Sequence, residues 1–114
     1  MKVEDEISMA QIKSFYEREK GCINAKRIRI EVSEGGGKVI ARYEDDICDT
    51  SKGCNWLWIC PGGKVGVRAE PFAGWEFGFW TLDGNPVSSE PKTYIQLYKG
   101  TIGAHFIYEC TRTK

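Results

Sequence analysis

The chain has 114 residues, enough for one domain with its own core, and its 16 basic and 16 acidic residues cancel. This balance excludes proteins that bind nucleic acid or acidic membranes through overall attraction, and it gives weak protection against self-association. Residues 1–6 are acidic and polar, and the sequence contains neither an apolar signal-peptide core nor a membrane-spanning run. We therefore expect a cytoplasmic protein, or one that a virus carries into its host cell.

The first predicted element is a helix over residues 9–20. Ser8 and Gln11 have the spacing of a capping box with Ser8 at the N-cap, and Gly21 follows the last helical residue. Apolar residues recur on one side of this segment, which is typical of a helix that docks on a sheet.

Strands are expected next. Two alternating runs, 26–32 and 39–43, flank the glycine triplet 35–37 and predict a hairpin. The acidic loop 44–53 lacks the ligand spacing of a calcium loop, so we predict no metal there. Residues 54–60 carry apolar side chains on both faces, which predicts a central strand.

The clearest strand signals lie at residues 65–69 and 75–80. Apolar and polar residues alternate in the first run, and Pro71 ends it because proline has no N–H for a ladder. Bulky aromatic residues alternate through the second run, and Asp83-Gly84 then gives a strong hairpin signal. The stretch reads as strand, turn, strand, turn.

The same stretch resembles the bacterial internalin B-repeat, also called the Listeria–Bacteroides repeat. The resemblance is carried by VGVRAEP from Val65, GWEFGFW from Gly74 and DGNPVS from Asp83, and it covers about residues 35–109. It implies a small β-grasp-like sheet and a role as a stalk or adhesion module of surface proteins. The chain differs from the family in its N-terminal helix, its five cysteines and its single copy of the repeat.

Two last strands are expected at residues 93–98 and 103–110. Together these elements predict one α+β domain over residues 1–114. One N-terminal helix packs on an antiparallel or mixed, β-grasp-like sheet of six to seven strands.

The cysteines suggest disulfides. Cys54 and Cys60 would lie roughly 20 Å apart on one strand, too far to pair. Cys48 can fold back on Cys54, and Cys22 can meet Cys110 if the chain ends lie together. Zinc spacing is absent, so no metal is expected. Because intracellular disulfides are a feature of hyperthermophiles, this usage would suit a small protein of an archaeal virus.

Little in the sequence indicates catalysis. His105 is the only histidine, and a strand would turn it away from Cys110, five residues on. A cysteine-dependent enzyme is therefore a remote alternative, and no cofactor is expected.

The surplus of aromatic residues favours a non-enzymatic binding or assembly module. One helix cannot cover a sheet that is apolar on both faces, so we predict a homodimer through sheet faces or edges. Trp56, Trp58 and Trp80 are its expected anchors.

The second hypothesis is a single-stranded nucleic-acid-binding protein. Tryptophans on the same sheet as arginines would offer stacking platforms beside cations. The arginines concerned are Arg27, Arg29, Arg42 and Arg68, of which Arg68 is the favoured binding residue.

Overall fold

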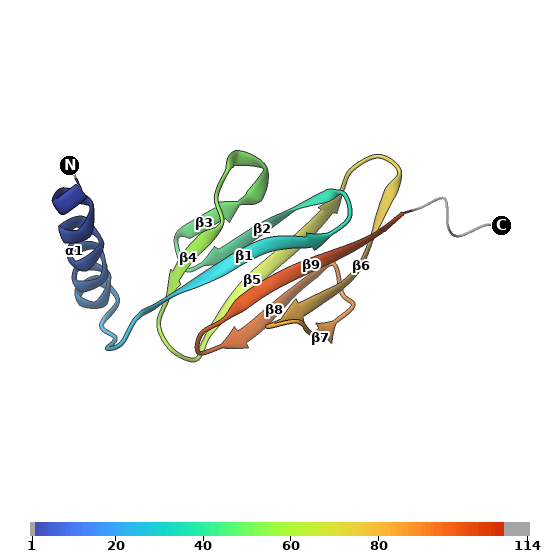
Figure 1. Ribbon diagram of the computed structural model, residues 1–114. Helices are drawn as coiled ribbons and strands as arrows, with labels where there is room; N and C mark the ends of the chain where they lie inside the picture. Colours follow the sequence, from blue (N-terminus) through green and yellow to red (C-terminus); the bar gives the residue numbers. More distant parts are fainter. Residues whose placement is uncertain (1, 109–114) are drawn as a thin grey trace.

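The computed structural model describes the backbone of residues 2–108 and the side chains from residue 11 onward. Within these residues the chain forms one α-helix, one short 3-10 helix and nine strands (Figure 1). Their bounds are α1 Lys2–Lys20, β1 Lys26–Glu34, β2 Gly37–Tyr43, β3 Asp46–Asp49, η1 Thr50–Lys52, β4 Trp56–Ile59, β5 Gly63–Pro71, β6 Trp75–Leu82, β7 Asn85–Ser88, β8 Lys92–Leu97 and β9 Thr101–Tyr108.

The strands form two sheets rather than the single predicted sheet of six to seven strands. Sheet A has the order β4-β1-β9-β6-β7, and sheet B has the order β3-β2-β5-β8. Every pairing in the described chain is antiparallel except that of β1 with β9. The α+β class is confirmed, but the β-grasp-like single sheet is wrong. The sandwich explains the many apolar strand faces, because the two sheets cover each other.

Alternation within each strand builds the core between the sheets. In β2 and β5 every second side chain is buried and the intervening ones face outward. Residues from both sheets meet in one apolar cluster. Its largest fully buried members are Trp80, Phe106, Ile28, Ile30, Ile59, Ile102, Val39, Val65 and Cys48.

The glycine triplet turns the chain from one sheet into the other. The predicted hairpin over residues 26–43 is wrong, because β1 lies in sheet A and β2 in sheet B. A Cβ on Gly35 or Gly37 would overlap Phe106, and one on Gly36 would lie 2.6 Å from Nε1 of Trp75. Aromatic rings pack directly on this backbone, and only glycine leaves room for them.

A bulge at Gly78 decides which aromatic residue of β6 enters the core. Phe77 pairs with Phe106 and Phe79 with His105, so one extra residue stands between these pairs. The alternation therefore shifts, and Trp80 is fully buried while Phe79 stacks on His105. The indole Nε1 of Trp80 donates to the carbonyl of Glu90 at 2.7 Å. Trp80 is a core residue, and its prediction as an interface anchor is wrong.

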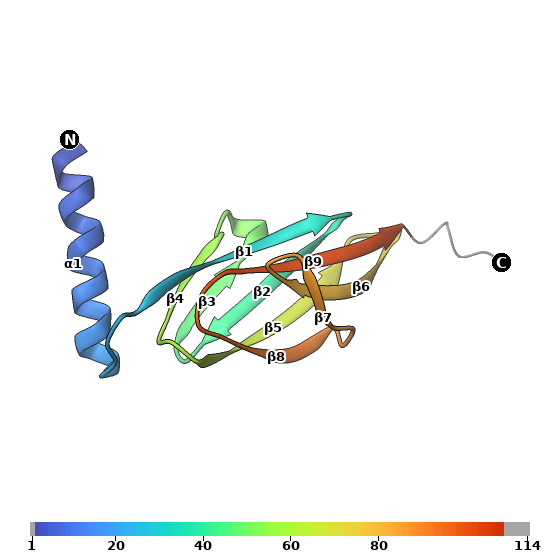
Figure 2. The ribbon, with the colours of Figure 1, turned by 60° about the horizontal axis from the view of Figure 1, so that its bottom comes forward.

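The helix begins earlier than predicted and stands apart from the sheets. It starts at Lys2, so Ser8 lies within it and is not its N-cap. Figure 2 and Figure 1 both place α1 at one end of the sandwich rather than over a sheet face. The predicted docking of the helix on a sheet face is therefore wrong, and α1 instead contacts the end of sheet A.

Candidate functional site

Two disulfides hold both ends of β4, the edge strand of sheet A next to the helix. Cys48–Cys54 ties its start to β3, as predicted, with Cα atoms 5.3 Å apart. Cys22–Cys60 ties its end to the segment that follows α1, with Cα atoms 5.9 Å apart. The predicted Cys22–Cys110 pair is wrong, because antiparallel pairing of β1 with β4 brings the chain before β1 beside Cys60. Cys110 itself lies outside the described residues.

Strand β4 is an edge strand rather than the predicted central strand, and the helix covers part of its open edge. The N–H of Ile30 donates to the carbonyl of Asn55 at 2.7 Å, and this fixes the ladder so that the carbonyl of Trp58 points away from β1. The hydroxyl of Tyr16 donates to that carbonyl at 2.8 Å. Burial raises the pKa of Tyr16, so its hydroxyl stays protonated as this donation requires.

Charged side chains hold the C-terminal end of the helix. Glu17 accepts from Nζ of Lys13 at 2.8 Å and from the N–H of Ala25 at 2.9 Å, and these bonds lower its pKa. Lys20 pairs with Glu44 at 3.2 Å, and this contact raises the pKa of Lys20. The helix is thus attached through its last two turns.

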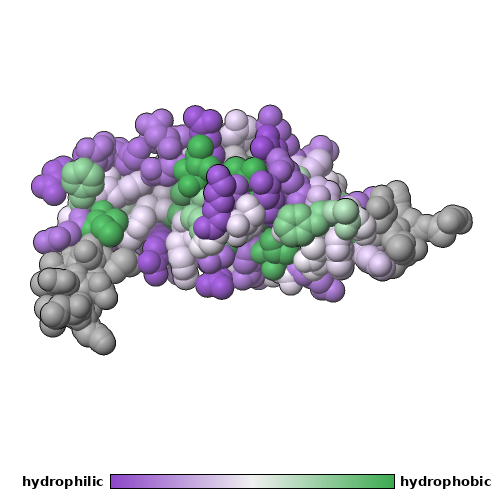
Figure 3. Space-filling model, turned by 90° about the horizontal axis from the view of Figure 1, so that it is seen from above, coloured by the Kyte–Doolittle hydropathy of each residue, from purple (hydrophilic) through white to green (hydrophobic). Residues whose placement is uncertain are grey.

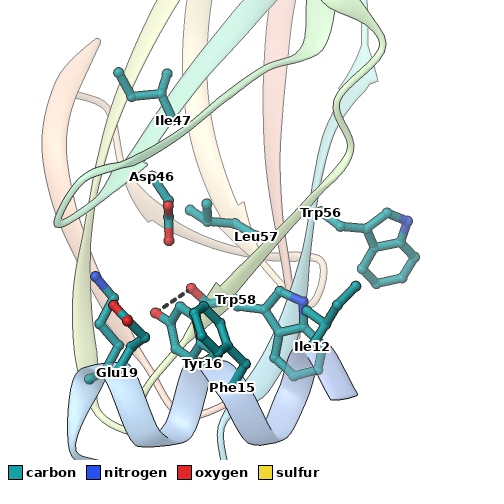
Figure 4. Close-up of a pocket in the computed structure, with 10 residues that line it drawn as sticks. Ile12, Phe15, Tyr16, Glu19, Asp46, Ile47, Trp56, Leu57 and Trp58 are labelled. Atoms are coloured by element: carbon teal, nitrogen blue, oxygen red, sulfur yellow. Dashed lines mark hydrogen bonds between the residues drawn. The ribbon is translucent and has the colours of Figure 1, made fainter. Parts of the chain in front are cut away.

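A groove lies between α1 and the edge formed by β3 and β4; we call it the helix–β4 groove (Figure 4). Its volume is about 430 Å³, and its lining residues are Ile12, Phe15, Tyr16, Glu19, Lys20, Asp46, Ile47, Trp56, Leu57 and Trp58. Several apolar members stay exposed: Phe15 at 59%, Ile47 at 62% and Ile12 at 46%. The groove is therefore an apolar surface with charges at its edge.

The two tryptophans of β4 occupy different places in this groove. Trp58 points toward the helix, where its ring centre lies 6.1 Å from that of Tyr16, whereas Trp56 points away from it (Figure 4). Arg27 and Arg29 lie over the ring of Trp56, at 4.3 and 5.3 Å from its centre. Such contacts hold the indole in place although Trp56 stays 41% exposed.

The structure brings together only part of the predicted binding set. Trp56 and Trp58 share the outer face of sheet A with Arg27 and Arg29, but Trp80 lies in the core. Arg42 and Arg68 lie on the outer face of sheet B, on the other side of the sandwich. The predicted surface with all four arginines on one sheet is therefore wrong. Sequence reasoning also missed Ile12, Phe15 and Ile47 as members of the groove. The signal for the first two was their shared helix face with Tyr16.

The residues considered for cysteine–histidine chemistry are engaged elsewhere among the described residues. His105 stacks on Phe79 with ring centres 4.5 Å apart, and its Nδ1 lies 3.8 Å from Glu34. The four described cysteines are all in disulfides and offer no thiol. Among the side chains of residues 11–108, no three of the metal-binding types gather into a cluster.

Comparison with known proteins adds no relative. No family model, no curated protein and no solved structure matches the chain. The resemblance to the internalin B-repeat thus stays a prediction. Among the described residues, no helix has the length and apolar character needed to cross a membrane.

Proposed function

We propose that this chain is a non-enzymatic assembly module that forms a homodimer through the helix–β4 groove. One observation carries the proposal: apolar side chains from α1, β3 and β4 gather around a single groove and remain exposed beside a closed core. Monomers rarely leave such groups in water without a partner. Tryptophan and phenylalanine are also frequent at the centres of interfaces.

The charges around the groove favour a second copy as the partner. Glu19 and Asp46 line the groove on the side of the helix end and β3, together with Lys20, whose charge is paired with Glu44. Arg27 and Arg29 flank Trp56 on the side of β1. A two-fold axis through the groove would place the acidic side of one protomer against the basic side of the other, which makes the patch self-complementary.

A contact through whole sheet faces has less support than this local one. The two sheets already cover each other's apolar sides within one chain. On the side of the molecule seen in Figure 3, hydrophobic residues lie in separate groups among hydrophilic ones. The groove therefore replaces the broad sheet face as the proposed interface.

The disulfides also bear on where the module works. Two disulfides in a small domain favour an oxidising compartment, because reducing compartments keep thiols free. This counts against the cytoplasmic location expected from the sequence. We place the assembly function in an oxidising compartment.

The test is the mass of the disulfide-intact chain in solution, measured by light scattering from micromolar to submillimolar concentration. We expect a dimer that Phe15→Glu converts to monomer, because the new charge would be buried in the interface. Phe72→Glu is the matched control, since Phe72 is exposed to 52% at the opposite end of the sandwich. A wild-type chain that stays at 12.9 kDa throughout would overturn the proposal.

A charge exchange tests the two-fold arrangement. Glu19→Arg and Arg27→Glu should each weaken the dimer by bringing like charges together, and the double variant should restore it. If the double variant is as weak as the two single changes combined, Glu19 and Arg27 do not face each other across the interface.

A further inference from the structure

A second candidate site lies on the outer face of sheet B. No helix covers this face in the described chain, because α1 stands at the end of the sandwich (Figures 1 and 2). The face contains an open hollow of about 840 Å³, which shares Ile47 with the helix–β4 groove. Its residues are Ile40, Arg42, Glu44, Ile47, Lys64, Gly66, Val67, Arg68, Lys92, Thr93 and Tyr94.

An exposed aromatic side chain stands in the middle of this face. Tyr94 of β8 pairs in register with Gly66 of β5. A Cβ on Gly66 would lie 3.2 Å from Cε1 of Tyr94, so the ring rests over the glycine. The side chain is nevertheless 74% exposed. One edge of the ring thus contacts the sheet, and most of the ring is open to a planar ligand.

Cations surround this ring. Arg42 is the other neighbour of Gly66 in register, and Arg68 stands opposite Lys92. Lys64 lies two residues before Gly66 on β5. Among the described residues, no ion pair engages Lys64 or Lys92.

The acidic groups of the face lie away from the ring or are engaged. Glu70 pairs with Arg68 at 2.9 Å and with Lys38 at 3.6 Å, and Asp49 lies 3.7 Å from Lys38. The pair of Arg68 with Glu70 is exposed on both sides, so a phosphate can compete for the guanidinium at little cost. Glu44 is the remaining acidic residue that lines the hollow. The surroundings of Tyr94 are therefore locally basic in a chain with no net charge.

We propose that the outer face of sheet B binds single-stranded nucleic acid, with a base stacked on Tyr94 and phosphates held by Lys64, Arg68 and Lys92. An exposed ring on an open sheet suits an unpaired base, whose flat face is accessible. A duplex keeps its bases stacked inside, and a sulfated polysaccharide has no planar ring to stack. Neither of those ligands would use Tyr94. The few cations make this a weak and salt-sensitive site.

The test measures binding of a short, fluorescein-labelled oligothymidine to the disulfide-intact chain by fluorescence anisotropy at low salt. Tyr94→Leu should raise Kd by about 5- to 100-fold, because one stacked base is lost. Tyr94→Phe should bind like the wild type. Gly66→Val should also weaken binding, since its side chain would lift the ring without removing a charge. Tyr108→Leu is the control, a similar change at an exposed tyrosine of sheet A.

Salt dependence tests the phosphate contacts. Lys64→Gln and Lys92→Gln should each lower the slope of log Kd against log salt by about 0.7. Phe15→Glu should disrupt the dimer and leave oligothymidine binding unchanged. The two proposals can therefore be tested independently.

Three results would overturn the site. The first is an absence of binding by the wild type up to submillimolar protein. The second is a Tyr94→Leu variant that binds like the wild type. The third is tighter binding of a DNA duplex or of heparin than of oligothymidine, since either would mean a surface that recognises charge alone.

Discussion

The two ends of the sandwich are held together by different means. At the glycine end, Gly35, Gly36 and Gly37 let Phe106 and Trp75 pack against bare backbone. At the helix end, two disulfides and the hydrogen bond from Tyr16 to Trp58 join the elements. Large apolar side chains stay exposed at both ends, for example Phe72 at the glycine end and Phe15 at the helix end. At the helix end they gather around a groove, and this makes the helix end the candidate interface.

The largest effect should separate two tryptophans, one inside the sandwich and one at the helix end. Trp80→Ala should lower the free energy of unfolding by about 5 kcal/mol, because it removes a buried ring and leaves the Glu90 carbonyl without its donor. Trp56→Ala should cost about 0.5–1 kcal/mol, since Trp56 is 41% exposed and mainly loses its contacts with arginines. Urea unfolding measures both. Equal losses of unfolding free energy in the two variants would contradict the assignment of Trp80 to the core and of Trp56 to the surface.

The next effect separates the two disulfides. In a Cys110→Ser background, removal of Cys22–Cys60 should cost about 4 kcal/mol and removal of Cys48–Cys54 about 2 kcal/mol, because the unfolded chain is constrained over the longer loop. The two bonds span 38 and 6 residues. Thermal unfolding of the paired Cys→Ser variants measures the difference. A larger loss for Cys48–Cys54 would mean that native contacts, rather than loop length, set its contribution.

A matched pair of glycines compares the packed glycine end with an open turn after β3. Gly35 and Gly53 both have φ of 87°, but a Cβ on Gly35 would overlap Phe106, whereas nothing lies within 4 Å of one on Gly53. Gly53→Ala should cost about 1 kcal/mol for the left-handed backbone alone. Gly35→Ala should cost about 3 kcal/mol, because overpacking adds to that strain. Similar losses in urea unfolding would show that the glycine end can relax around a methyl group.

The smallest effect concerns acid at the helix end. The pKa of Glu17 is lowered by its bonds to Lys13 and to the N–H of Ala25, so the folded state holds its carboxylate more strongly than the unfolded state. Its contribution is present above the unfolded pKa and is lost as pH falls through the lower folded value. Helix-end stability should therefore fall below about pH 4.5, the ordinary range of a glutamate.

Amide exchange of the α1–β1 connection against pH measures this loss. Glu17→Gln should remove that part of the pH dependence, and Glu31→Gln is the control at an exposed glutamate of β1. An unchanged pH profile in Glu17→Gln would assign the acid sensitivity to other carboxylates.

How far the sequence predicts this fold depends on whether a signal is local. The alternation in β5, the stop at Pro71 and the hairpin at Asp83-Gly84 depend on neighbouring residues, and the structure confirms all three. The prediction of a turn at the glycine triplet is confirmed, but the prediction of a hairpin there is wrong. Phe106 and Trp75, which pack on the triplet, are distant from it in sequence. Local patterns give elements, whereas the choice between one sheet and two depends on those distant contacts.

The errors at the candidate sites have similar causes. Trp80 was assigned to the surface because strict alternation was continued through Gly78, although an isolated glycine in a strand is a known sign of a bulge. Cys48–Cys54 was predictable from its short span, whereas Cys22–Cys60 depends on the pairing of β1 with β4. The Tyr94–Gly66 pair required the register of two strands that are separated in sequence by β6 and β7.

The position of β9 has a consequence for synthesis of the chain. It is the last strand of the described residues, yet it lies at the centre of sheet A, between β1 and β6. A nascent chain that still lacks β9 can make only the fragments β4-β1 and β6-β7 of that sheet. Sheet A therefore closes only after residues up to Tyr108 have left the ribosome, and until then β1 lacks its parallel neighbour.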